Sequence, residues 1–165
     1  MRQHAAKKVI IFVVILLGTM ALGLSAERII GTDADHTVVG TWTLNVAKSN
    51  FNPGPAPTMQ TRVYEEKVDG IKVTVKTQWA DGHSTTVLIA ANYDGKDYPV
   101  VGSDDYDAIS LQKASDRISE AMLMHAGTVV ANARREVSED GRIMTIVYKT
   151  SSGKMHNTAV YDRQE

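Results

Sequence analysis

The chain of 165 residues contains no cysteine. This absence excludes disulfide crosslinks, thiolate metal sites and a lipid anchor attached to a cysteine. Proline and aromatic residues are also scarce, with four prolines and 6% aromatics. Neither sign of charge dominates, since 18 basic residues face 19 acidic ones. Because a nucleic-acid-binding surface is normally basic, we expect no nucleic acid as partner.

Long apolar runs are absent except for residues 9–24, which follow three cations, Arg2, Lys7 and Lys8. Small residues then lead to Ala26, and this order is typical of a secretory signal peptide over residues 1–26. The alternative is an uncleaved membrane anchor, and this segment is the only part of the chain that we expect to contact a membrane. The apolar run over residues 9–24 is shorter than the roughly 20 residues that a membrane span needs. We expect export, to the periplasm or the extracellular space. Mass analysis of the secreted product should show a chain that starts after Ala26, and an intact Met1 would contradict this.

The part of the chain after Ala26 has the length of one domain and is large enough to bury a core without crosslinks. Removing the three leader cations leaves 15 basic against 19 acidic residues, a net charge of −4. Residues 27–38 show no periodicity and are predicted to form a flexible arm. Residues 39–165 are predicted to form the domain.

Apolar and polar residues alternate most regularly over residues 71–79. Ile71, Val73, Val75, Thr77 and Trp79 share one face, while Lys72, Thr74, Lys76 and Gln78 share the other. A period of two with one polar face predicts a strand in a sheet with one wetted side. Similar runs predict about ten short strands in all. Residues 117–127 also fit a helical stripe, so a short helix there is the alternative.

The turn signals favour a closed barrel. Asp-Gly pairs, which suit tight hairpins, occur at 69–70, 81–82, 94–95 and 140–141. Strands joined by consecutive hairpins form an antiparallel meander, and closing the meander removes its exposed edges. We therefore predict an all-β fold, an antiparallel meander closed into a barrel of about 8–10 strands. A β-sandwich is the competing architecture.

Both ends of the predicted domain resemble a known family. The sequence "GTWTL" at 40–44 resembles the Gly-x-Trp start of lipocalins and fatty-acid-binding proteins, the calycin barrels. The segment 133–165, "ARREVSEDGRIMTIVYKTSSGKMHNTAVYDRQE", is similar to the last three strands of fatty-acid-binding proteins. The whole chain also resembles a group of secreted bacterial lipocalin-like proteins whose function is unassigned.

The resemblance implies candidate ligand contacts. Arg135 matches an inward arginine that holds a carboxylate in fatty-acid-binding proteins, and Tyr161 matches the tyrosine of their Arg-x-Tyr on the last strand. Ala159 fills the place of the second arginine, so the complete anion clamp is absent. Small side chains at Ala131, Ala133 and Ala159 would leave room for a ligand. Tyr161 could equally be an ordinary core residue.

The alternation along 128–138 makes Arg135 the single charge on an apolar stripe. A buried guanidinium needs an internal acceptor, a bound anion or water. The structural alternatives are a pair with a carboxylate, or a stack on Trp42 that closes one end of the barrel.

A proline-rich segment stands where the family has two helices. Pro53, Pro55 and Pro57 exclude a regular helix and favour a stiff, extended course. We predict that this segment lies across one end of the barrel as a lid, with Phe51 and Met59 as apolar anchors. A solvated turn is the alternative.

Catalytic signals are missing from the sequence. The histidines of the predicted mature chain lack metal-ligand spacing, and there is no nucleophile elbow and no glycine-rich phosphate loop. We expect a non-enzymatic protein without a cofactor or metal. It would carry a small apolar or amphipathic ligand. The alternative is an interaction module of the cell envelope or the extracellular space, with a filled barrel that binds a protein or a glycan.

Overall fold

The computed structural model describes residues 37–153 and 156–165. The predicted signal peptide, and residues 27–36 of the predicted arm, lie outside this part of the chain. The described residues form ten strands and one short 3-10 helix, η1 (Val46–Lys48). The strands are β1 (Gly40–Leu44), β2 (Met59–Lys67), β3 (Gly70–Gln78), β4 (Ser84–Asn92), β5 (Asp94–Val101), β6 (Ala108–Ser115), β7 (Ile118–His125), β8 (Thr128–Val137), β9 (Ile143–Thr150) and β10 (His156–Arg163).

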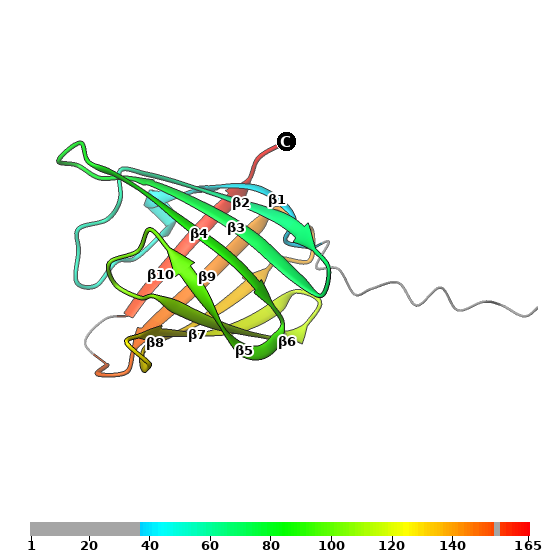
Figure 1. Cartoon of the computed structure of the whole chain (residues 1–165). Helices are drawn as coiled ribbons and strands as arrows, with labels where there is room; N and C mark the ends of the chain where they lie inside the picture. Colours follow the sequence, from blue (N-terminus) through cyan, green and yellow to red (C-terminus); the bar gives the residue numbers. More distant parts are fainter. Residues whose placement is uncertain (1–36, 154–155) are drawn as a thin grey trace, which may run out of the picture. The chain divides into compact units, whose positions relative to one another are not determined.

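The ten strands form a closed antiparallel barrel (Figure 1). Each strand pairs with the next in sequence, and β1 pairs with β10 to complete the ring. The predicted all-β barrel is therefore confirmed, and the sandwich alternative is wrong. Because the barrel is closed, every strand has a hydrogen-bonded neighbour on each side, and no strand stands at the edge of an open sheet.

Residues 117–127 are not helical. The strand β7 pairs with both β6 and β8, so its backbone groups are used in two ladders. Ser119, Ala121 and Leu123, at spacings of two residues, all line the interior cavity of the barrel, which matches the period of a strand. The helix alternative for residues 117–127 was wrong because backbone pairing with β6 and β8 decides the conformation of this segment, and that pairing overrides its local helical pattern.

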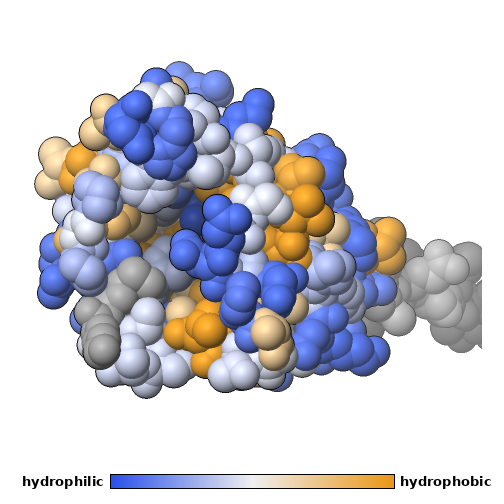
Figure 2. All heavy atoms as spheres, turned by 60° about the vertical axis from the view of Figure 1, so that its left-hand side comes forward, coloured by the Kyte–Doolittle hydropathy of each residue, from blue (hydrophilic) through white to orange (hydrophobic). Residues whose placement is uncertain are grey.

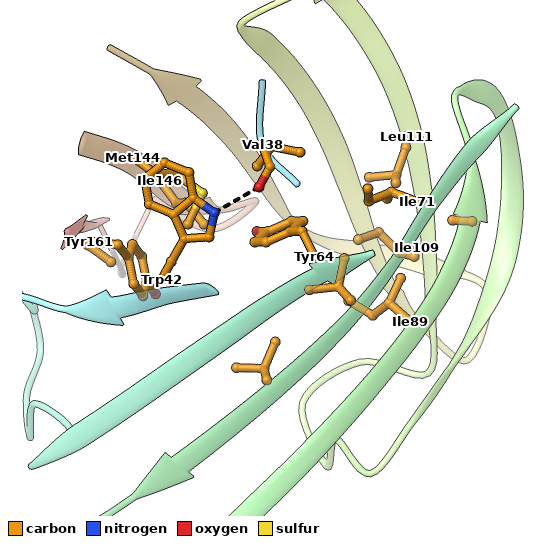
Figure 3. Close-up of a cluster of buried hydrophobic side chains, with 14 of the residues drawn as sticks. Val38, Trp42, Tyr64, Ile71, Ile89, Ile109, Leu111, Met144, Ile146 and Tyr161 are labelled. Carbon is orange, nitrogen blue, oxygen red and sulfur yellow. Dashed lines mark hydrogen bonds between the residues drawn. The ribbon is translucent and has the colours of Figure 1, made fainter. Parts of the chain in front are cut away.

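The alternation along β3 places its apolar face in the interior. Ile71, Val73 and Val75 are buried, whereas Lys72 and Lys76 are exposed. Figure 3 shows buried side chains pointing inward from strands on different sides of the barrel, with Tyr64 among them. One face of the sheet thus forms the core and the other faces solvent.

One end of the barrel is closed around Trp42. Its side chain is fully buried, and the indole N–H donates to the carbonyl of Val38 over 2.8 Å (Figure 3). The guanidinium of Arg163 lies 4.2 Å from the Trp42 ring centroid and donates to backbone carbonyls of Val39 and Gly141. Arg163, and not Arg135, therefore forms the stack on Trp42.

Among the described residues, no helix is long and apolar enough to cross a membrane.

Candidate functional site

The barrel contains a cavity with a volume of about 60 Å³. Most of its wall is apolar and comes from β3, β4, β6, β7 and β9: Ile71, Val73, Ile89, Ile109, Leu111, Leu123 and Ile146. Its polar lining consists of Arg62, Tyr64, Tyr106, Ser119, Arg135 and Tyr148. Two guanidinium groups on the wall of one largely apolar chamber distinguish this cavity from an ordinary packing void.

Arg62, on β2, is held by neutral groups. Its Nε donates to the hydroxyl of Tyr161 over 3.0 Å and to Oε1 of Gln60 over 3.3 Å. Its Nη2 donates to the hydroxyl of Tyr148 over 2.8 Å. Within residues 37–153 and 156–165, no carboxylate forms an ion pair with Arg62. The positive charge of this partly buried side chain is therefore not neutralised by the described part of the protein.

The pKa shifts in this cluster favour a positively charged Arg62 and neutral tyrosines. Burial opposes the charge of Arg62, but the surrounding tyrosine oxygens outweigh it, and the pKa of Arg62 is raised well above its usual value. Burial raises the pKa of Tyr106 to about 12. The pKa values of Tyr148 and Tyr161 are also raised, mainly by burial. At neutral pH the guanidinium is thus charged, and the phenols are neutral hydroxyls that can donate hydrogen bonds.

Arg135, on β8, occupies a second polar position on the same cavity. Its side chain is only 8% exposed, and its Nη2 donates to the hydroxyl of Tyr93 over 3.3 Å. The guanidinium carbon lies 5.4 Å from the ring centroid of Tyr64. Lys113 lies over the Tyr93 ring at 5.3 Å. The rings of Tyr64 and Tyr93 thus lie within cation–π distance of Arg135 and Lys113, respectively.

The structure brings some of the sequence-predicted ligand contacts to the cavity. Ala133 and Arg135 both line it. Tyr161 is 1% exposed and acts on the site through its hydroxyl, which accepts from Arg62 and donates to Gln60 over 2.5 Å. Ala159 is buried on β10 beside Ile146 of β9, and it does not line the cavity.

The proline-rich segment joins η1 to β2 and lies at the left-hand end of the barrel in Figure 1. The amide of Asn52 donates to the side chain of Asn157 on β10, and the amide of Thr58 donates to the carbonyl of Gln78 on β3. Both ends of the segment are therefore tied to barrel strands.

Between these ties the segment is only partly packed. Phe51 contacts the core and Pro57 is buried, whereas Pro53, Pro55 and Met59 are exposed. Figure 2 shows this end of the molecule, where the surface is hollowed and both hydrophilic and hydrophobic atoms are visible at depth. That the segment acts as a lid stays a prediction.

Arg62 and Gln60 were missed at the level of sequence. They share the inward face of β2 with Tyr64, at spacings of two residues, and this alternation was the available signal. It was ambiguous because Thr61 and Val63, on the other face, also suit a strand interior.

The part of the chain that the structure describes contains no group of three or more histidine or acidic side chains placed to hold a metal ion.

Comparison with known proteins found structural similarity at low sequence identity. No family model matches the chain, and no curated protein matches it. Among solved structures, a redesigned β-barrel is 12% identical with a TM-score of 0.47, and the match covers 81% of this chain and 96% of that one. A second redesigned β-barrel, mFAP1 bound to DFHBI, is 15% identical with a TM-score of 0.41, with coverage of 79% and 99%. A biogenic amine-binding protein is 9% identical with a TM-score of 0.43, with coverage of 78% and 64%.

The strand pairing of the described residues defines the class of this protein, a closed ten-stranded antiparallel β-barrel.

Proposed function

We propose that this protein is an exported, non-enzymatic binding protein that takes a small amphipathic ligand into its barrel. An anionic group of the ligand would contact Arg62, and its apolar part would lie against the isoleucine, valine and leucine wall. The observation that carries this proposal is the charged guanidinium of Arg62, which lines an apolar cavity and has only neutral hydrogen-bond partners among the described residues.

The physical argument is one of charge compensation. Holding a cation in a largely apolar chamber costs several kcal/mol unless it is paired and hydrogen-bonded. The hydrogen bonds of Arg62 use Nε and Nη2, so Nη1 has no protein partner among the described residues. The hydroxyls of Tyr106 and Tyr148 lie on the same cavity and can donate as well. A cluster of donors around one positive charge fits a carboxylate, sulfate or phosphate group.

The size of the cavity limits the ligand. Its volume is about 60 Å³, whereas pockets for drug-sized ligands hold roughly 300–1,000 Å³. The site as it stands has room only for a small polar or anionic group, since its volume corresponds to roughly two water molecules. A longer ligand would have to displace side chains or extend through the hollowed end of the barrel.

The same small volume favours the second candidate, a filled barrel that acts as an interaction module. On the outer wall, Leu88 of β4 and Val101 of β5 are register partners, 44% and 61% exposed. They would contribute an apolar contact for a macromolecular partner. This candidate requires no small-molecule binding at all, so a binding experiment separates the two.

Titration calorimetry with ethyl, butyl, hexyl and octyl sulfate tests the proposal. We expect affinity to rise with chain length, because each added methylene group withdraws apolar surface from water. Arg62→Met should weaken binding by about tenfold to a hundredfold, since hydrogen bonds to charged groups contribute roughly 1.5–3 kcal/mol. Arg134→Met is the matched control, because Arg134 lies on the outer face of β8 and pairs with Glu120.

Thermal melts of both variants should show that the barrel remains folded, because Arg62→Met leaves no buried carboxylate without its partner among the described residues and Arg134 is exposed. If the wild-type protein binds none of the alkyl sulfates, or if Arg62→Met binds them as the wild type does, the proposal is wrong. Native mass spectrometry of the purified protein would in addition reveal a co-purified natural ligand.

A further inference from the structure

Gln60 lies at the centre of the polar cluster, and its amide has a defined orientation. Oε1 of Gln60 accepts from Nε of Arg62 over 3.3 Å and from the hydroxyl of Tyr161 over 2.5 Å. Its Nε2 donates to Oγ1 of Thr77 over 2.8 Å. Because Nε of arginine can only donate, the atom facing it must be the amide oxygen.

These contacts position Arg62 without neutralising it. Gln60 precedes Arg62 by two residues on β2, so both side chains leave the same face of the strand. Thr77 lies opposite Gln60 on β3 and is buried, so it fixes the far side of the amide. Glutamate has the same shape as glutamine and could make the same contacts to Arg62 and Tyr161. The shape of the site would therefore accept either glutamine or glutamate at position 60, and the two residues differ there only in charge.

We propose that Gln60 is the specificity-determining residue of the Arg62 site. Its amide oxygen orients the guanidinium of Arg62. Because the amide is neutral, the positive charge of Arg62 remains available to the ligand, and the site would prefer anionic amphiphiles over neutral or cationic ones. This inference rests on the proposed function. A carboxylate at position 60 would occupy the charge of Arg62 from within the protein, and an incoming anion would then meet an ion pair of no net charge.

The variant Gln60→Glu tests this directly. The barrel should tolerate it, since the hydroxyl of Thr77 can donate to the second carboxylate oxygen in place of accepting from the amide. Calorimetry with hexyl sulfate, hexan-1-ol and hexylammonium gives the readout. We expect hexyl sulfate to bind about tenfold to a hundredfold more weakly than to the wild type, as for the loss of a charged hydrogen bond. The affinity for hexan-1-ol should stay within about threefold, and hexylammonium should gain affinity, because packing is unchanged and only charge differs.

Two further variants separate charge from structure. Gln112→Glu adds the same charge on the exposed outer face of β6 and should leave all three affinities unchanged. Gln60→Met removes the orienting acceptor but adds no charge, so it should keep the preference for hexyl sulfate over hexan-1-ol.

The outcomes distinguish the two proposals. If the wild type does not bind hexyl sulfate, the proposed function fails and this inference fails with it. If the wild type binds hexyl sulfate and Gln60→Glu binds it equally well, only the role of Gln60 is overturned. Loss of the anion preference in Gln60→Met would overturn it too, because that variant leaves the charge of Arg62 without a carboxylate. An equal loss for all three probes in Gln60→Glu would mean a structural defect and contradict the charge mechanism.

Discussion

Replacing Trp42 with alanine is expected to lower the free energy of unfolding by about 3–5 kcal/mol, the usual cost of truncating a large buried aromatic side chain. The indole is fully buried beside Met144 and Tyr161 (Figure 3). Its removal would leave a cavity, deprive the carbonyl of Val38 of its donor and remove the surface on which Arg163 stacks. Urea denaturation followed by far-UV circular dichroism measures the loss.

Trp79→Ala is the matched control for this prediction. Trp79 follows β3 in the turn to β4, is only partly buried and stacks on His83 at 5.7 Å. Its removal should cost distinctly less than that of Trp42, since less surface is withdrawn from water. Equal losses for the two tryptophans would mean that the Trp42 end does not dominate the stability of the barrel.

Gly102→Ala is expected to produce the second large effect. Gly102 has a φ of +85°, and an added Cβ would lie 2.0 Å from the carbonyl oxygen of Thr86 on the neighbouring strand. The positive φ should cost about 1–2 kcal/mol for a residue with a Cβ. The backbone contact should add about 1–3 kcal/mol more, because the paired strands β4 and β5 would have to separate.

Gly82→Ala isolates the two contributions. Gly82 has nearly the same φ, +87°, but no atom lies within 4 Å of its added Cβ. It should therefore show the conformational cost alone, and the difference between the two variants in thermal or urea unfolding should report the crowding at Gly102. Similar destabilisation in both variants would show that β5 moves away from Thr86 without cost.

The candidate site illustrates how closure of a barrel joins distant parts of a chain. The strand β1 lies between β2 and β10, and Trp42 is the register partner of both Arg62 and Arg163. Side chains of β2 and β10 can therefore meet inside the barrel across one short strand, as Arg62 and Tyr161 do. The resemblance to fatty-acid-binding proteins directed attention to Ala159, but the guanidinium beside Tyr161 comes from Arg62 on β2, which is 99 residues away in the sequence.

Much of the architecture could be predicted from the sequence. Alternation along β3 and the Asp-Gly turn residues between the strands are local properties of the chain, and they were enough to predict an antiparallel all-β meander. The inward position of Arg135 followed from the same local alternation along β8. Such predictions succeed because the side-chain period of a strand does not depend on which strand lies beside it.

The tertiary structure alone decided which residues meet. The pairing of β7 on both sides excluded the helix, the stacking of Arg163 on Trp42 displaced Arg135 from that role, and the closure between β1 and β10 brought Arg62, Gln60, Tyr148 and Tyr161 into one cluster. Gln60 and Tyr161 are 101 residues apart along the chain. A contact over that distance depends on the number and register of all the strands around the ring, and no local pattern in the sequence encodes it.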